Sequence, residues 1–133
     1  MNLYVYLQVK DPQKIHFTSP FSKLFKSKRY TCFEADQESE PYLLAQGSDF
    51  LKAADHVVIH LDVEEGIAIG NLAHFFESLR KQKTSPYMVC QGKNKALQNM
   101  IKALKKEVTF VSSEREAIGC FEDYLKSNLS ASK

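Results

Sequence analysis

Three carboxylates stand close together near the middle of the chain, where Asp62, Glu64 and Glu65 precede Gly66. Carboxylates gathered at the end of a strand could bind a divalent cation, or raise one another's pKa for acid–base catalysis. The alternative is that they lie at the N-terminus of the following helix, where negative charge is favoured by roughly 0.3–1 kcal/mol. The sequence leaves both interpretations open. No glycine-rich phosphate-binding motif accompanies the run, which argues against a standard nucleotide loop.

The histidines and cysteines lack the spacing of metal ligands or nucleophiles. His60 lies inside an apolar segment, where a neutral histidine bonded to a neighbour is expected, and no HExxH or CxxC motif occurs. Cys32, Cys90 and Cys120 are odd in number and far apart, which indicates a reducing compartment. We expect Cys90 and Cys120 to be inert in the core, and Cys32, on an edge strand, to be the thiol worth testing. We expect no metal and no cofactor.

Size and composition predict one globular domain. The chain has 133 residues, 44% hydrophobic and 26% charged, with a net charge of +2, which excludes a coiled rod and a disulfide-rich knot. The apolar runs are shorter than the ~20 residues that a membrane helix needs. The N-terminal segment also lacks the pattern of a secretion signal. We expect one domain over residues 1–126 and a flexible tail over 127–133, in the cytoplasm and away from membranes.

Short apolar strands alternate with amphipathic helices along the chain. Clusters of β-branched and aromatic residues predict the strands, and apolar residues at i, i+3 and i+4 predict the helices. The strands are expected over 3–9, 30–35, 56–62, 87–90 and 108–111. The helices are expected around 21–29, 41–54, 72–79, 97–104 and 113–125. Gly47 is a place where the second helix could kink or begin late, and Ser113 with Glu116 predicts a capping box.

This alternation is typical of a parallel sheet between two helix layers. Five βα units without a dinucleotide fingerprint favour an α/β three-layer sandwich, mainly parallel, with the flavodoxin-like strand order 2-1-3-4-5. Ligands of such sheets bind beyond the carboxyl ends of the strands, near the point where the strand order reverses. The candidate ligand-binding residues therefore end the strands: Lys10, Asp11, Asp36, Asp62, Glu64, Glu65, Gly66, Gln91, Gly92, Ser112 and Ser113.

Charge is arranged in blocks of opposite sign. A basic block, 23–29, directly precedes an acidic block, 34–40, and a second basic series follows from Lys93 to Lys106. Nucleic-acid binding would need the basic blocks to merge on one face with aromatic residues between them, and the net charge of only +2 argues against it. Alternating blocks suit a protein partner or self-association. The edge strand 30–35 is where we expect a homodimer to form.

Residues 30–77 resemble the middle of the nucleoside 2-deoxyribosyltransferase-like and TIR-like families. The likeness is carried by Ala54 and Asp55 followed by the strand HVVIHLD. It implies a flavodoxin-like fold with a pocket at the strand ends, which holds a nucleoside or nucleotide and cleaves its N-glycosidic bond. The Glu on which these families rely is absent from its place in GIAIGNLAHFFE, since Glu65 comes too early and Glu77 too late. No catalytic residue is carried over.

Residues 56–125 also resemble STAS domains, the anti-sigma-factor antagonists. The shared succession is the strand HVVIHLD, a helix, the strand MVC, an amphipathic helix, the strand VTFV and then SSEREAI. This resemblance implies a regulator with a STAS-like strand order. Where that family has a phosphorylatable Ser in an Asp-Ser-Ser-Gly motif, this chain has Glu64, Glu65 and Gly66.

Together these patterns predict a non-catalytic interaction or regulatory module that works through its strand ends and the helix after Gly66. One alternative is a nucleotide-directed N-glycosidase or deoxyribosyltransferase-like enzyme with Asp62, Glu64 or Glu65 as the acidic group. Another is a STAS-like regulator without the phosphorylatable Ser. An FMN-binding flavodoxin is disfavoured, because the segment 10–12 lacks the Ser/Thr/Gly-rich run that holds the phosphate. The expected partner is a protein or a second copy, with a nucleoside or nucleotide as the alternative ligand.

Overall fold

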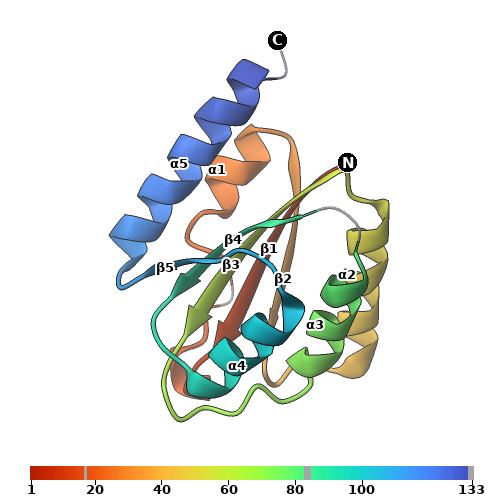
Figure 1. The fold of residues 1–133 in the computed structure, drawn as a ribbon, viewed down its shortest axis with the longest axis vertical. Coiled ribbons are helices and arrows are strands. Elements are labelled where there is room, and N and C mark those ends of the chain that lie inside the picture. Colours follow the sequence, from red (N-terminus) through yellow and green to blue (C-terminus); the bar gives the residue numbers. More distant parts are fainter. Residues whose placement is uncertain (17, 83–84, 132–133) are drawn as a thin grey trace.

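Five parallel strands form the centre of the protein, shown by a computed structural model that describes residues 1–16, 18–82 and 85–131 (Figure 1). The strands are β1 (Asn2–Val9), β2 (Tyr30–Asp36), β3 (His56–Val63), β4 (Tyr87–Gln91) and β5 (Thr109–Val111). They lie in the order β2-β1-β3-β4-β5, and every neighbouring pair is parallel. The expected fold class and strand order are confirmed.

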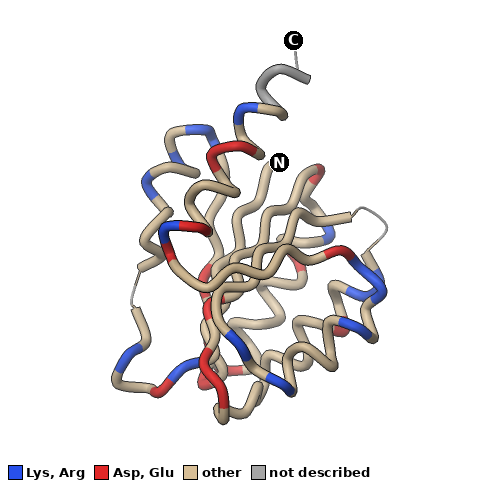
Figure 2. Tube along the Cα trace, turned by 60° about the vertical axis from the view of Figure 1, so that its left-hand side comes forward, with Lys and Arg blue, Asp and Glu red and all other residues tan. Residues whose placement is uncertain are grey.

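Helices cover both faces of this sheet, so the central strands are buried on both sides and mostly apolar, with Gln8, His60 and Asp62 as buried polar residues. One layer contains α1 (Ser22–Ser27) and α5 (Glu114–Ala131). The other contains α2 (Pro41–Ala53), α3 (Leu72–Lys81) and α4 (Lys95–Leu104). A short 3-10 turn, Pro12–Lys14, follows β1. Basic and acidic segments occur in both layers, and neither layer carries a single sign of charge (Figure 2).

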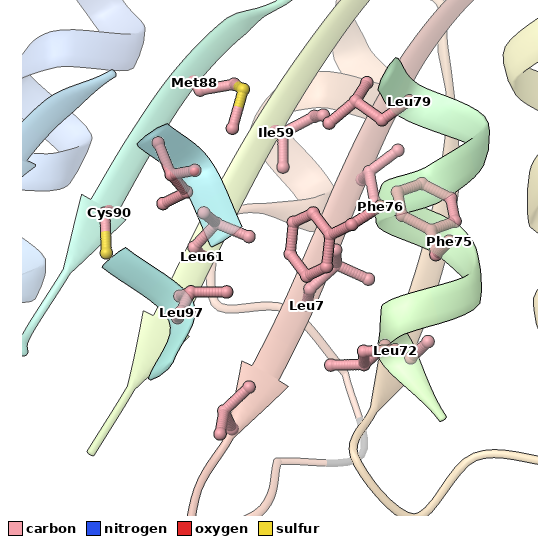
Figure 3. Packing of buried hydrophobic residues seen from close by; sticks show 14 of the residues in the cluster. Leu7, Ile59, Leu61, Leu72, Phe75, Phe76, Leu79, Met88, Cys90 and Leu97 are labelled. Carbon is pink, nitrogen blue, oxygen red and sulfur yellow. The ribbon is translucent and has the colours of Figure 1, made fainter. Parts of the chain in front are cut away.

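The side chains of β1 and β3 alternate between the two faces, as the two-residue period of a strand requires. Odd-numbered residues such as Leu7, Ile59 and Leu61 pack with Phe76 in the larger core, on the side of α2, α3 and α4 (Figure 3). Even-numbered residues face α1 and α5. There the ring of Tyr4 stacks on Phe25 at a centroid distance of 4.0 Å and meets Phe121 edge-on at 6.1 Å.

Gly47 neither kinks α2 nor delays its start, because the helix runs from Pro41 to Ala53. The glycine instead makes room for a neighbouring ring. A Cβ atom at position 47 would lie 2.5 Å from two ring carbons of Phe33, a buried residue of β2. Close packing against the sheet therefore outweighs the roughly 1 kcal/mol that glycine costs inside a helix.

The C-terminal helix extends beyond the expected domain boundary. α5 continues to Ala131, past residue 126, so most of the segment expected to be a tail is helical. Residues 132–133 lie outside the described part of the chain. In the described ranges, none of the helices is both long and apolar enough to cross a membrane.

Candidate functional site

Lys10 and Asp62 meet where the strand order reverses, between the carboxyl ends of β1 and β3. The Nζ atom of Lys10 lies 2.6 Å from Oδ2 of Asp62, and the two side chains are only 12% and 8% exposed. The hydroxyl group of Tyr6 donates a hydrogen bond to the same carboxylate oxygen at 2.6 Å. The parallel register, which pairs Gln8 with Asp62, brings these groups together from segments more than 50 residues apart.

An open cleft of about 630 Å³ lies at this ion pair. Its lining combines apolar residues with charges of both signs: Lys10, Gln13, Lys14, Ile15, His16, Asp62, Val63 and Glu64. The loop after β1 is held against the sheet by Gln8, whose side-chain amide donates to the carbonyl of His16 at 2.9 Å and accepts from its N–H at 2.8 Å. The cleft is where the sequence predicted a site, and three of the candidate residues line it.

Glu64 and Glu65 bind different partners, so they do not form the carboxylate cluster of the first interpretation. Glu64 accepts from the backbone N–H of Asp11 at 3.0 Å and from Lys14 Nζ at 3.2 Å. The hydrogen bond from the Asp11 amide is the largest cause that lowers the pKa of Glu64, and the hydrogen bond from Lys14 lowers it further. Glu65 accepts from the backbone N–H of Lys95 at 3.1 Å.

The alternative interpretation, in which these carboxylates lie at the N-terminus of the next helix, was also wrong. α3 begins only at Leu72. Glu65 instead binds the first turn of α4, where unpaired amide groups favour an anion. Asp62, Glu64 and Glu65 each bind different partners. They therefore do not combine as metal ligands or as an acid–base pair. In residues 1–16, 18–82 and 85–131, no group of three His, Cys, Asp or Glu side chains could hold a metal ion.

His60 is fully buried beside this site and belongs to a continuous chain of hydrogen bonds. Its Nε2 lies 2.9 Å from Oε1 of Gln91, and its Nδ1 lies 3.3 Å from the hydroxyl of Tyr4. That hydroxyl is also 2.7 Å from Oγ of Ser19. Since the Gln91 oxygen accepts only, Nε2 carries the proton and Nδ1 accepts from Tyr4, with Ser19 donating to Tyr4 in turn.

Burial keeps this histidine neutral, as the sequence predicted. Desolvation lowers the pKa of His60 to about 4, although the Gln91 bond and the charge of Asp62 act in the opposite direction. Burial also raises the pKa of Tyr4 and of Tyr6, and the carboxylate of Asp62 raises that of Tyr6 further. These groups hold their protons near neutral pH and act as fixed donors rather than as acids.

The remaining candidates end their strands but do not join the cleft. Asp36 accepts from the N–H of Glu38 at 2.7 Å and so shapes the turn before α2. Gly66 lies on the exposed loop after β3 with a φ of 81°. Gly92 has a φ of 99°, and a Cβ there would lie 2.2 Å from the carbonyl oxygen of Val63. Only glycine fits that approach.

Ser112 and Ser113 belong to the start of α5. Ser113 Oγ accepts from the N–H of Glu116 at 3.2 Å, which is the expected cap. The carboxylate of Glu116 instead accepts from the hydroxyl of Ser112 at 2.6 Å, so the described bonds contain one half of the predicted capping box and not its reciprocal half.

Two buried side-chain amides, those of Gln37 and Asn94, hold the loops around the site, and neither was identified from the sequence. Gln37 accepts from the N–H of Lys10 at 3.3 Å and donates to the carbonyl of the same residue. Asn94 caps α4 by accepting from Leu97 N at 3.0 Å. Its amide group also donates to the carbonyls of Glu64 and Ile67 at 2.9 and 2.8 Å. The position of Asn94 directly before a helical stripe is a signal that could have identified the cap.

Phe110 forms a second surface feature, on the outer edge strand β5. Its side chain is 53% exposed. One groove beside it, of about 410 Å³, is lined by Gln98, Ile101, Lys102, Lys105, Lys106 and Val108. A second groove, of about 480 Å³, is lined by Gly92, Lys93, Gln98, Val111, Ser112 and Glu116. We call Phe110 with these two grooves the Phe110 surface.

Burial disfavours the thiolate form of Cys90 and of Cys32. Cys90 is buried, and desolvation raises its pKa to about 12. Cys32 is half-buried on β2, and desolvation raises its pKa as well. Cys120 is also half-buried, which is more exposed than expected. A raised pKa lowers the thiolate fraction at neutral pH.

Comparison of the chain with protein-family models, with curated proteins and with solved structures found no match.

Proposed function

We propose that the protein is a non-catalytic cytoplasmic module that binds another protein through the Phe110 surface. The observation that carries the proposal is the exposure of Phe110, a large apolar side chain that lies between two grooves on an edge strand. The arrangement at the strand ends supports it too. There the acidic groups are held by Lys10, Lys14 and the start of α4, and contribute to loop structure.

The chemistry of the grooves favours an acidic, extended segment as the partner. β5 ends the sheet, so it pairs with β4 on one side and can accept an added strand on the other. Lys93, Lys102 and Lys105 surround the aromatic ring and are all exposed. Carboxylates on either side of an apolar anchor would complement this surface.

A single-stranded nucleic acid fits the Phe110 surface less well. Such ligands stack successive bases on several aromatic side chains along a cationic groove. The two grooves contain one aromatic residue, Phe110, and Glu116 contributes a negative charge to one of them. Glu116 would repel a phosphate backbone, whereas a peptide can place a basic or neutral residue beside this glutamate.

Selection from a random peptide display library tests this proposal with a defined probe. We expect the selected peptides to combine Asp or Glu with one large apolar residue, and their binding to fall at least about tenfold in Phe110→Ala. The control is Phe50→Ala, because Phe50 is 36% exposed in the opposite half of the molecule. Selected peptides that bind Phe110→Ala as well as the wild type, or tighter binding of oligothymidylate than of any peptide, would overturn the proposal.

The alternative function is nucleotide-directed N-glycosidase or transferase chemistry at Asp62. A specific observation favours Asp62 over Glu64 and Glu65: among these three cleft or loop carboxylates it is the buried one, 5% exposed, and it accepts a hydrogen bond from Tyr6. A thermal-shift screen with nucleosides, nicotinamide nucleotides and FMN tests it. A ligand at 100 times its dissociation constant adds about 2.7 kcal/mol of stability. A shift that Asp62→Asn abolishes, together with release of the free base, would support the enzyme.

A further inference from the structure

β2 is the long open edge of the sheet, and its position leaves half of its backbone groups without a neighbouring strand. The strand has seven residues, with neither Pro nor Lys among them to discourage pairing. The N–H of Gln37 donates to the carbonyl of Gln8, which fixes the alternation along β2. Backbone groups of residues 33 and 35 therefore point to β1, and those of Cys32 and Glu34 point to the open side.

The charges at the two ends of β2 are opposite. Exposed Lys26 and Lys28 lie in α1 and the turn just before the strand. Exposed Glu38 and Glu40 lie in the turn just after it. An antiparallel copy of the same edge places the basic end of one chain beside the acidic end of the other, twice. A parallel copy would place like charges together.

From this pattern we infer that a second copy of the chain binds along β2, antiparallel and around a two-fold axis. The axis passes through Cys32, so that residue 28 of each chain lies near residue 36 of the other and residue 30 near residue 34. A register centred on Glu34 would instead place two carboxylates opposite each other, which is unfavourable. The result is a closed pair with one continuous ten-stranded sheet, because a two-fold edge contact uses each β2 once.

This inference is independent of the Phe110 surface, since β2 and β5 lie at opposite ends of the sheet. The two surfaces provide reciprocal controls. Lys102→Glu/Lys105→Glu reverses two charges beside Phe110, and Lys26→Glu/Lys28→Glu reverses two charges beside β2. Each double variant should impair one interaction and leave the other unchanged. A wild type that does not dimerise contradicts only this inference, and a wild type that binds no acidic peptide contradicts only the proposed function.

Charge reversal with rescue is the decisive experiment. In sedimentation equilibrium we expect the wild type to dimerise, and to dissociate more readily as salt is added. Lys26→Glu/Lys28→Glu makes both ends of β2 acidic, and Glu38→Lys/Glu40→Lys makes both ends basic. Each should raise the dimer dissociation constant about 100-fold or more. An equimolar mixture of the two should restore a heterodimer.

Amide exchange provides a readout that separates loss of pairing from loss of folding. In the wild type, protection of the Cys32 and Glu34 amides should rise with protein concentration, while those of Phe33 and Ala35 stay protected throughout. Both charge-reversal variants should keep the Phe33 and Ala35 protection and lose the concentration dependence. A wild type that stays monomeric up to millimolar concentration, or reversed variants that fail to pair when mixed, would overturn the inference.

Discussion

Nζ of Lys10 and Oδ2 of Asp62 lie 2.6 Å apart, in a place where both side chains are about nine-tenths buried. Two buried charges stabilise a fold only when they are paired with each other. Removing one of them leaves its partner buried without a counter-charge. The pair therefore holds the ends of β1 and β3 together whether or not a ligand occupies the cleft beside it.

Truncation of one member of this pair should be costly. We expect Lys10→Met to lower the free energy of unfolding by about 3–5 kcal/mol, because Asp62 is left buried without its counter-charge. In the triple variant Tyr6→Phe/Lys10→Met/Asp62→Leu, most of that loss should be recovered, since no polar group then remains unpaired. Urea unfolding measures both. Equal stability of the single variant and the wild type would show that the pair contributes nothing.

His60 should make the protein less stable in mild acid. Its pKa is about 4 in the folded protein, against 6.5 in the unfolded chain, so the unfolded state binds its proton first as the pH falls. The contribution is complete above pH 6.5 and is lost between pH 6.5 and 4, at up to about 1.4 kcal/mol per pH unit.

Unfolding free energies measured from pH 7 to pH 4 test this expectation. His60→Gln should show a shallower pH dependence than the wild type, and His74→Gln, which changes an exposed histidine, should match the wild type. Proton NMR of the wild type gives a second measurement that needs no variant. A His60 ring that titrates near pH 6.5 in the folded protein would contradict the burial argument.

The two helical glycines should respond in opposite ways to alanine. Gly47→Ala brings a methyl group against the ring of Phe33 and should lower stability by about 1–3 kcal/mol. Gly119→Ala in α5 meets no atom within 4 Å and should raise stability by about 0.5–1 kcal/mol through helix propensity alone. Thermal unfolding of the pair compares them directly. A stabilised Gly47→Ala would mean that Phe33 can move aside.

The rate at which each cysteine is labelled should depend on how deeply its thiol is buried. Cys90 is fully buried and its pKa is about 12, so iodoacetamide at neutral pH should modify it only after the protein unfolds. Cys32 should react slowly, because desolvation also raises its pKa. Mass spectrometry of peptides labelled at several times gives the order. Rapid labelling of Cys90 would indicate that β4 opens readily.

The elements and their order could be predicted from local patterns in the sequence. An unbroken apolar core in residues 57–59 predicted a strand covered on both faces, and Leu72, Phe75, Phe76 and Leu79 predicted a one-sided helix; both are observed. Such patterns are readable because burial acts on every second residue of a strand and on every third or fourth of a helix. The same local logic placed Lys10 and Asp62 at neighbouring strand ends.

Which side chains contact one another depends on the three-dimensional packing and could not be predicted from local patterns. Glu65 binds the first turn of α4 rather than α3, because Asn94 holds the loop after β3 against the start of α4. Gly47 proved to be a contact site for a ring from β2, and Phe110 proved to be exposed on a three-residue edge strand. Each outcome depends on contacts between segments far apart in the chain, whereas periodicity reports only which face of its own element a residue occupies.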